Sequence, residues 1–184
     1  MVVDKDFENV RAFINGDEKA FNSIAQKYQQ KIYWHARKMI GNHLDADEVT
    51  QEVLIVLYKK LKDFNFKSSL YTWIFRITTT RSINQINKNR IRKFLSINDS
   101  DIESMKYEDD ILQTIESKEK LKMLDSVLQK IPVKQREIFL LRHMDELSYE
   151  EISEINGKSI GGLKANYFHA IKKVMELMRK DESE

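Results

Sequence analysis

The residues best suited to chemistry in this 184-residue chain are cations interleaved with aromatic rings, between positions 64 and 93. The seven cations, with no acid among them, are Lys67, Arg76, Arg81, Lys88, Arg90, Arg92 and Lys93. The rings are Phe64, Phe66, Tyr71, Trp73 and Phe75. Cations follow a phosphate backbone, and ring faces receive unstacked bases. The segment is therefore predicted to bind single-stranded or melted nucleic acid.

A second pattern, over residues 148–174, is typical of a helix-turn-helix, which suits intact duplex. Ser148 and Glu151 form a capping box that opens a short helix, and Asn156-Gly157 supplies a left-handed stop. The outward face of the following helix shows Gly161, Gly162, Lys164, Ala165, Phe168, His169 and Lys172. Paired helices with tight turns are common, so the pattern alone leaves DNA binding and plain packing equally open.

The chemistry of that outward face favours DNA. Glycines at a helix N-terminus let exposed amides approach phosphate, whose charge the helix dipole favours. Ala165 and Phe168 can touch thymine methyl groups, and Lys164 can donate to a guanine edge or a phosphate.

Catalysis finds little support in the sequence. The chain has no cysteine, and His35 and His43 are eight residues apart, off the spacing of four that places two imidazoles on one helix face. No Gly-rich phosphate loop or nucleophile motif appears. The chain is therefore not expected to be an enzyme, and no cofactor or metal is expected. A DNA recombinase, which would need a serine or tyrosine nucleophile with clustered arginines, is a third class that a plasmid-cleavage assay would reveal.

The composition predicts which elements hold these residues. Five glycines, one proline and long helical periodicities predict an all-α fold. The longest apolar run, about residues 53–58, is far short of the roughly 20 residues of a membrane span, and the acidic start is unlike a signal peptide. We expect no membrane insertion and a cytoplasmic location.

Charge is segregated along the chain. Residues 94–117 hold seven acids against one lysine and lack apolar periodicity, which predicts a flexible acidic linker. The predicted organisation is two small helical domains, residues 1–93 and 118–184, joined by that linker, with the helix-turn-helix in the second.

The third predicted helix has an unusual polar face. Asp45 with Glu48 resembles a capping box, and the face opposite the apolar stripe holds Glu48, Gln51, Glu52, Ile55 and Lys59. An isoleucine ringed by acids is either an ordinary exposed residue or a partner-binding spot.

A fourth helix is predicted to begin near Ser68 or Ser69. It carries a run of hydrogen-bonding side chains, Thr78, Thr79, Thr80, Ser82, Asn84, Gln85, Asn87 and Asn89, that is unusual for a helix interior. Contacts to bases or phosphates would explain the run, and so would a frayed polar helix end.

Ordered motifs across the chain give a resemblance. They are Gly16-Asp17-x-x-Ala20-Phe21, the stretch Asp-Ala-Asp-Glu-Val-Thr-Gln-Glu at 45–52, Phe64 with Tyr-Thr-Trp-Ile-Phe-Arg-Ile at 71–77, Leu-Gln-Lys-Ile-Pro-x-x-x-Arg-Glu-Ile-Phe at 128–139, Leu-Ser-Tyr-Glu-Glu-Ile at 147–152, and Ile-Gly-Gly-Leu-Lys at 160–164. Together they resemble bacterial sigma factors of the extracytoplasmic-function (ECF) group, over nearly the whole length.

The resemblance implies a dissociable initiation subunit that binds core RNA polymerase and directs promoter-specific transcription, with promoter DNA and an anti-sigma protein as further partners. The core polymerase surface would comprise Asp47, Glu48, Gln51, Glu52 and Ile55. The minus-ten contacts would be Phe64, Trp73, Arg76, Thr80, Arg81, Asn84 and Lys88. The minus-thirty-five contacts would be Ser159, Gly162, Lys164, Ala165, Phe168 and His169. The linker would pass near the polymerase active-site cleft.

The chain departs from the family pattern at several of these positions. Thr80 stands where Asn is usual and Asn84 where Asp is common, while Asn166, His169 and Ile171 replace frequent arginines. These differences concern which promoter sequence is recognised. Because the last helix has fewer arginines, the second domain is predicted to bind DNA phosphates more weakly. The competing function is a stand-alone helix-turn-helix regulator, whose first domain would serve ligand binding or dimerisation and which would bind an operator without polymerase.

Overall fold

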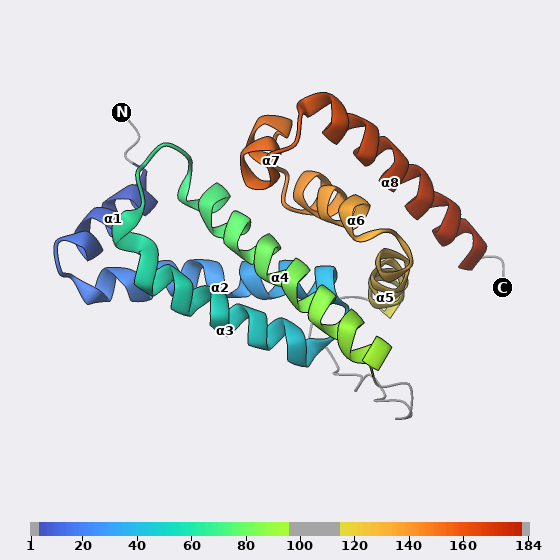
Figure 1. Cartoon of the computed structure of the whole chain (residues 1–184), viewed down its shortest axis with the longest axis horizontal. Coiled ribbons are helices and arrows are strands. Elements are labelled where there is room, and N and C mark those ends of the chain that lie inside the picture. Colours follow the sequence, from blue (N-terminus) through green and yellow to red (C-terminus); the bar gives the residue numbers. More distant parts are fainter. Residues whose placement is uncertain (1–3, 96–114, 182–184) are drawn as a thin grey trace.

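The computed structural model describes residues 4–95 and 115–181, and within these ranges every regular element is helical (Figure 1). The first group is α1 (Lys5–Ile14), α2 (Glu18–Ile40), α3 (His43–Lys60), the 3₁₀ turn η1 (Leu61–Asp63) and α4 (Leu70–Leu95). The second group is α5 (Ile115–Lys130), α6 (Val133–Phe139), the π-helical turn η2 (Leu140–Met144), α7 (Tyr149–Asn156) and α8 (Ile160–Asp181). The all-α prediction is confirmed, and the predicted acidic linker lies almost wholly outside the described residues.

Local capping explains where the helices of the first group begin and end. Asp17 accepts from the Lys19 amide and opens α2, and Gly41 closes it in the left-handed conformation at φ +95°. The N-cap of α3 is Asn42, whose side chain accepts from the Asp45 amide, so the prediction that Asp45 caps this helix is wrong. Asn42 is the N-cap because it directly follows the left-handed Gly41, where the chain turns into α3. Asp45 already lies within the first turn of the helix.

The helix-turn-helix forms as its caps predict. Ser148 accepts from the Glu151 amide at 3.1 Å, while the Glu151 carboxylate accepts from the Ser148 amide at 2.8 Å, which completes the capping box. Gly157 ends α7 at φ +71°. Ser159 then accepts from the Gly162 amide at 3.3 Å at the start of α8.

The first four helices enclose a core that their apolar spacing predicts. The predicted stripe of α3 is buried in full: Ala46, Val49, Val53, Leu57 and Leu61. It packs against the apolar sides of α2 and α4, including Ile24, Ile32, Leu70 and Ile74.

The two groups of helices pack on each other. Figure 1 shows α7 beside the first half of α4, with α8 on the outer side. Leu141, Leu147 and Ile152 of the second group belong to the same buried cluster as the core of the first group. Buried Arg136 of α6 donates to the Met39 carbonyl at the end of α2. This docking places the second domain against α2 and α4.

Candidate nucleic-acid interface

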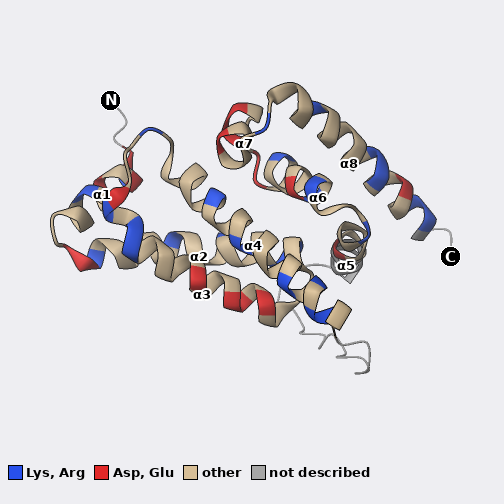
Figure 2. Cartoon of the chain, viewed as in Figure 1, with Lys and Arg blue, Asp and Glu red and all other residues tan. Residues whose placement is uncertain are grey.

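One stripe of α4 carries most of the residues predicted to contact melted DNA. Arg76, Thr80, Asn84 and Lys88 are all exposed and recur every four residues. Residues four apart on a helix are neighbours on its surface, so the stripe spans about 18 Å at 1.5 Å per residue. Figure 2 shows that α4 carries basic but no acidic residues, in contrast to α3 beside it. Arg81 lies beside this stripe with its side chain 41% exposed, so the surface holds three cations and no acid of α4, and we call it the cationic track.

The track leads into a surface pocket at the start of α4. The pocket has a volume of about 350 Å³, and its walls are Asp63, Asn65, Lys67, Ser68, Thr72, Trp73, Arg76 and Glu154. Asn65 accepts from the Lys67 amide at 3.1 Å, and Ser69 accepts from the Thr72 amide at 3.0 Å. These bonds fix the loop before α4. The pocket thus combines an indole, two cations, two carboxylates and several uncharged polar groups.

Phe64 is the exception among the predicted contact residues, because it is only 4% exposed. Its ring packs on Phe7, Phe66 and Trp73, with centroids 5.9, 5.0 and 5.4 Å away. The prediction of a direct contact between Phe64 and DNA is therefore not supported by this structure. Phe64 instead supports the Trp73 ring at the wall of the pocket.

Much of the polar run on α4 also points inward. Thr78, Thr79 and Ser82 are buried, and the Thr78 hydroxyl donates to the Ile74 carbonyl of its own helix. Thr79 bonds to the ring of His35 at 3.1 Å. A role in contacting bases or phosphates is excluded for these three side chains in this arrangement. Thr80 remains exposed, although its hydroxyl donates to the Arg76 carbonyl at 2.8 Å.

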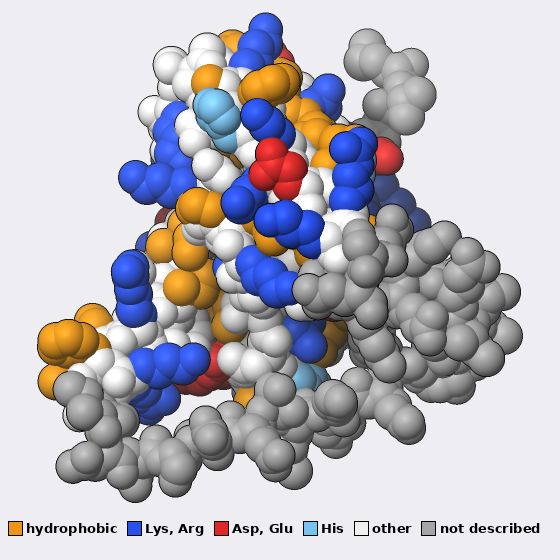
Figure 3. Space-filling view, turned by 90° about the vertical axis from the view of Figure 1, so that its right-hand side faces the viewer, with side chains coloured by type: hydrophobic (Ala, Val, Ile, Leu, Met, Phe, Trp, Pro, Cys, Tyr) orange, Lys and Arg blue, Asp and Glu red, His pale blue; other side chains and the backbone are white. Residues whose placement is uncertain are grey.

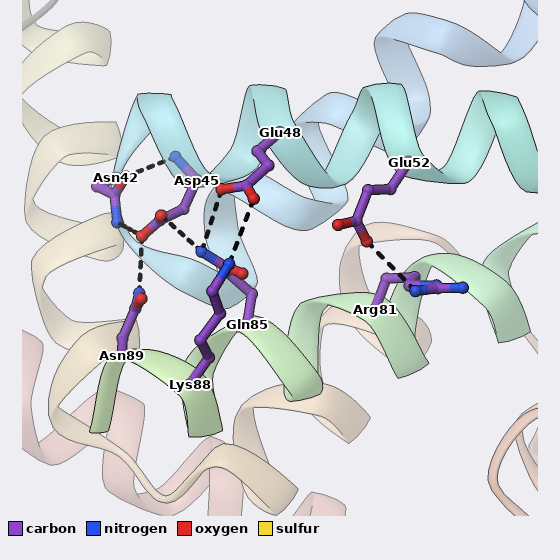
Figure 4. A network of polar contacts seen from close by, with 8 residues as sticks. All are labelled: Asn42, Asp45, Glu48, Glu52, Arg81, Gln85, Lys88 and Asn89. Carbon is purple, nitrogen blue, oxygen red and sulfur yellow. Dashed lines mark hydrogen bonds and ion pairs between the residues drawn. The ribbon is translucent and has the colours of Figure 1, made fainter. Parts of the chain in front are cut away.

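The acidic face of α3 lies directly against α4 (Figure 4). Glu52 pairs with Arg81 and Glu48 with Lys88, each at 3.4 Å. All four side chains are between 41% and 48% exposed. Each pair thus joins a residue predicted to contact polymerase to a residue predicted to contact DNA.

Asp45 forms the inner, more buried part of the same network. It accepts from Gln85 and Asn89, each at 2.7 Å, and its neighbour Asn42 also donates to it (Figure 4). Burial raises the pKa of Asp45, but the hydrogen bonds from these amides, aided by the charge of Arg92, outweigh burial and hold the pKa below its usual 3.8. Asp45 therefore fastens the start of α3 to α4.

The rest of the predicted polymerase surface is accessible. Asp47 and Gln51 are exposed and bonded to each other at 2.8 Å. Ile55 is 54% exposed, as its place on the polar face predicts. An apolar side chain bordered by acids lies open on this face of α3.

The outward face of α8 presents its predicted residues to solvent. Ser159, Gly162, Lys164, Ala165, Phe168 and His169 are all exposed. The Phe168 ring is 66% exposed on this face. Figure 3 looks onto the end of the molecule where α8 finishes, and on that face Lys and Arg side chains predominate over Asp and Glu. The helix thus offers cations, a ring and its backbone on one side.

The structure also buries polar residues that the sequence patterns did not single out. His35, with a fully buried side chain, bonds to Asp145 at 2.8 Å across the domain boundary. Burial lowers the pKa of Arg136 to about 10. His35 lies next to the buried stripe of α2, which runs from Ile24 to Ala36. The sequence pattern therefore indicates that His35 is near the core, but it does not indicate that Asp145 is its hydrogen-bond partner. The described residues contain no group of acids and histidines suited to hold a metal ion.

Comparisons with known proteins match the two groups of helices separately. Residues 24–91 match the family Sigma-70 region 2, and residues 121–174 match Sigma-70, region 4. The ECF RNA polymerase sigma-E factor of Escherichia coli (strain K12) is 30% identical over 163 residues, which cover 84% of each chain. The chain belongs to the ECF group of sigma factors.

Other members of the ECF group agree. The ECF RNA polymerase sigma factor SigW of Bacillus subtilis (strain 168) is 29% identical over 171 residues, covering 89% of this chain and 90% of that one. Among solved structures, the sigma factor RpoE from Bartonella quintana, in complex with the anti-sigma factor NepR, aligns with a TM-score of 0.74 at 24% identity. It covers 88% of this chain and 98% of RpoE. CnrH, in complex with the cytosolic domain of CnrY, aligns with a TM-score of 0.73 at 18% identity, covering 97% and 99%. At these identities the structures support the fold alone.

No helix among residues 4–95 and 115–181 is both long enough and apolar enough to cross a membrane.

Proposed function

We propose that this ECF-type sigma factor binds core RNA polymerase and directs promoter-specific initiation through three surfaces on separate helices. The acidic face of α3 binds polymerase, the cationic track of α4 with its pocket binds the melted minus-ten strand, and the outward face of α8 binds the minus-thirty-five duplex. The observation that carries the proposal is the continuity of the α4 track with the pocket at Trp73 and Arg76.

The track suits a strand that has left the duplex. A single strand exposes both its phosphates and its base faces, and cations with an adjacent ring bind both. Unstacking a base from the duplex costs a few kcal/mol. A pocket that holds the flipped base must offset this cost by stacking on the base and by hydrogen bonds to its edge. Trp73 supplies a ring, and Asn65 and Ser68 supply hydrogen-bonding groups in a pocket of about 350 Å³. We assign this pocket to a base extruded from the minus-ten element.

The α8 face suits an intact duplex. A recognition helix enters the major groove with its N-terminal residues at the base edges, where Lys164 and Ala165 lie. Phe168 and His169 follow one turn later. Gly162, exposed near the helix start, leaves room for a phosphate to approach the backbone.

The acidic face of α3 suits a basic partner. Glu52 lies one turn before the exposed Ile55, and Glu48 and Asp47 lie further toward the start of α3, which gives an apolar contact beside an acidic patch. Sigma-family membership supports core polymerase as that partner and disfavours a stand-alone helix-turn-helix regulator. We further propose an anti-sigma protein as a second partner, a non-catalytic role, and action in the cytoplasm, where polymerase and DNA meet.

Reconstitution tests this function. The full chain is mixed with bacterial core polymerase and genomic DNA, and initiation sites are mapped by sequencing the transcripts. The proposal predicts a discrete set of start sites that depend on the added chain, with permanganate-reactive thymines near each. A chain that never binds core polymerase, or that binds DNA operators only on its own, would refute it.

A further inference from the structure

The ring of Tyr149, the first residue of α7, lies beneath a cation of the neighbouring helix. The Lys164 ammonium of α8 stands over this ring, with its Nζ atom 5.7 Å from the ring centroid. The two helices pack together as the halves of the helix-turn-helix (Figure 1). The proposed function assigns Lys164 to the minus-thirty-five duplex and gives Tyr149 no role. A residue without an assigned DNA contact thus touches one that has such a contact.

The Tyr149 ring is itself held in place. It directly follows Ser148, whose capping box fixes the start of α7, and the ring is half-buried. The guanidinium of Arg142 lies 5.2 Å from the centroid of the same ring and is tied down by its bond to the Leu147 carbonyl at 3.0 Å. The Tyr167 ring of α8 meets it edge-on, with the centroids 6.2 Å apart. The ring is therefore a fixed platform for the Lys164 side chain.

A platform of this kind changes how a lysine binds. The lysine side chain is long and flexible, so it loses much rotamer freedom when a ligand fixes it. The face of a tyrosine ring attracts an ammonium group electrostatically. A contact that already restricts the side chain reduces the freedom that remains to be lost on binding. Tyr149 can therefore orient Lys164 before DNA arrives.

Accepting the proposed function, we propose that Tyr149 is a positioning residue for base recognition by Lys164. Its ring directs the ammonium toward a base edge in the major groove of the minus-thirty-five element, because Lys164 lies near the start of α8, the part of such a helix that meets base edges. An ammonium only donates hydrogen bonds, and guanine presents two acceptors there, N7 and O6. The base pair that Lys164 reads is therefore expected to contain guanine.

The effect expected from the ring is modest and confined to one base pair. Loss of an exposed contact between a cation and a ring is expected to reduce discrimination at that base pair by about two- to five-fold. A purely structural defect of α7 would instead displace the whole of α8 and weaken binding to every sequence. Discrimination measured position by position thus separates the two roles.

The test uses holoenzyme reconstituted from the full chain and core polymerase, on a promoter found by transcript mapping. Each base pair of the minus-thirty-five element is replaced in turn, and affinities are measured by competition. Lys164→Ala is expected to lose the preference for guanine at one base pair. Tyr149→Leu, which removes the ring but keeps an apolar side chain, is expected to relax the preference at that same pair and leave the other positions unchanged. Tyr149→Phe keeps the ring and is expected to discriminate as the unaltered chain does.

A double-mutant cycle ties the effect of the ring to the lysine. Adding Tyr149→Leu to Lys164→Ala is expected to cause no further loss of discrimination. Four results would overturn the proposal. Tyr149→Leu weakens binding at every position alike, or raises affinity because the ring holds the lysine away from DNA. Tyr149→Phe is as defective as Tyr149→Leu, which would assign the role to the hydroxyl. Lys164→Ala weakens all sequences equally, as loss of a phosphate contact does.

This proposal and the proposed function fail separately. If the holoenzyme initiates from promoters and Lys164→Ala relaxes one base pair, but Tyr149→Leu changes nothing there, only the positioning role is wrong. If the unaltered chain gives no promoter-dependent initiation with core polymerase, the proposed function itself is wrong.

Discussion

His35 of α2 and Asp145, which follows η2, lie 110 positions apart and bond at 2.8 Å across the boundary between the two domains. The His35 side chain is fully buried, and its other ring nitrogen bonds to Thr79 of α4. Glu154 of α7 meanwhile reaches the wall of the proposed base pocket. Docking of the second domain thus brings a carboxylate to the site that we assign to DNA.

On the proposed assignment of α4 and α8, this docked arrangement is too short to reach both promoter elements. Elements about 25 base pairs apart lie about 85 Å apart on a duplex at 3.4 Å per pair. Since α7 contacts both α4 and α8, the two DNA surfaces are only two helix layers, about 20 Å, apart. If α4 and α8 bind the two elements as proposed, we expect the domains to separate when both elements are bound.

Loosening the His35 contact should favour the open form. Asp145→Asn removes the charged acceptor, and losing a buried bond of this kind costs about 1 to 3 kcal/mol of docking free energy. The chain has no cysteine, so cysteines introduced at the exposed residues Asn22 and Lys173 can carry spin labels. We expect longer distances between the labels in Asp145→Asn than in the unaltered chain. Glu146→Gln, at the exposed neighbouring acid, should leave them unchanged, and equal distances in both variants would argue against the contact as a latch.

Ile55→Lys should weaken polymerase binding without unfolding the chain. Ile55 is 54% exposed, so its replacement is expected to change the free energy of unfolding by no more than about 0.5 kcal/mol. A lysine there places a positive charge where we expect basic polymerase groups. Affinity for core polymerase, measured by titration of labelled chain, is expected to fall by about ten-fold or more, because like charges brought together at an interface cost several kcal/mol. The control is Gln26→Lys, at an exposed position on α2. If Ile55→Lys binds core polymerase as tightly as the unaltered chain, α3 is not part of the polymerase interface.

Asp45 should make stability depend on acidity. Because its pKa is lower in the folded chain than the usual 3.8, its contribution is complete above about pH 5 and is lost as pH falls through the folded pKa, below 3.8. Urea unfolding should therefore show Asp45→Asn less stable than the unaltered chain at pH 7, with the difference shrinking below pH 4. Asp47→Asn, on the exposed side of the same helix, serves as the control. A difference that stayed constant from pH 7 to pH 3 would contradict the role of the Asp45 charge.

Helix ends and buried stripes could be predicted because their causes are local. Ser148, Gly157 and Ser159 each act on a backbone group within five residues, and the stripe of α3 follows directly from its spacing. The pattern of Asp45 with Glu48 predicts the wrong cap, because the competing Asn42 stands directly before the helix and accepts from the Asp45 amide. Where two residues near a helix start can both act as the N-cap, the backbone geometry determines which of them does.

The contacts between elements could not be predicted, because they depend on which helix faces which. Phe64 belongs to an aromatic pattern typical of a DNA-binding surface, yet its ring is buried beneath Trp73. Glu52 and Arg81 were each assigned to a different partner, and only the packing of α3 on α4 shows that they pair. Periodicity identifies exposed and buried faces but does not identify the neighbouring helix.

The most direct test of the account asks whether α4 and α8 act at different steps of one reaction. Holoenzymes containing Lys164→Ala or Arg81→Ala are compared on the same promoter by footprinting for binding and by permanganate for melting. Lys164→Ala should weaken promoter binding by about 1 to 3 kcal/mol while the bound fraction melts normally. Arg81→Ala should bind the minus-thirty-five duplex nearly as well as the unaltered chain and leave the thymines of the minus-ten element less reactive. Normal melting with Arg81→Ala, or the same defect in both variants, would contradict the division of labour proposed for the two helices.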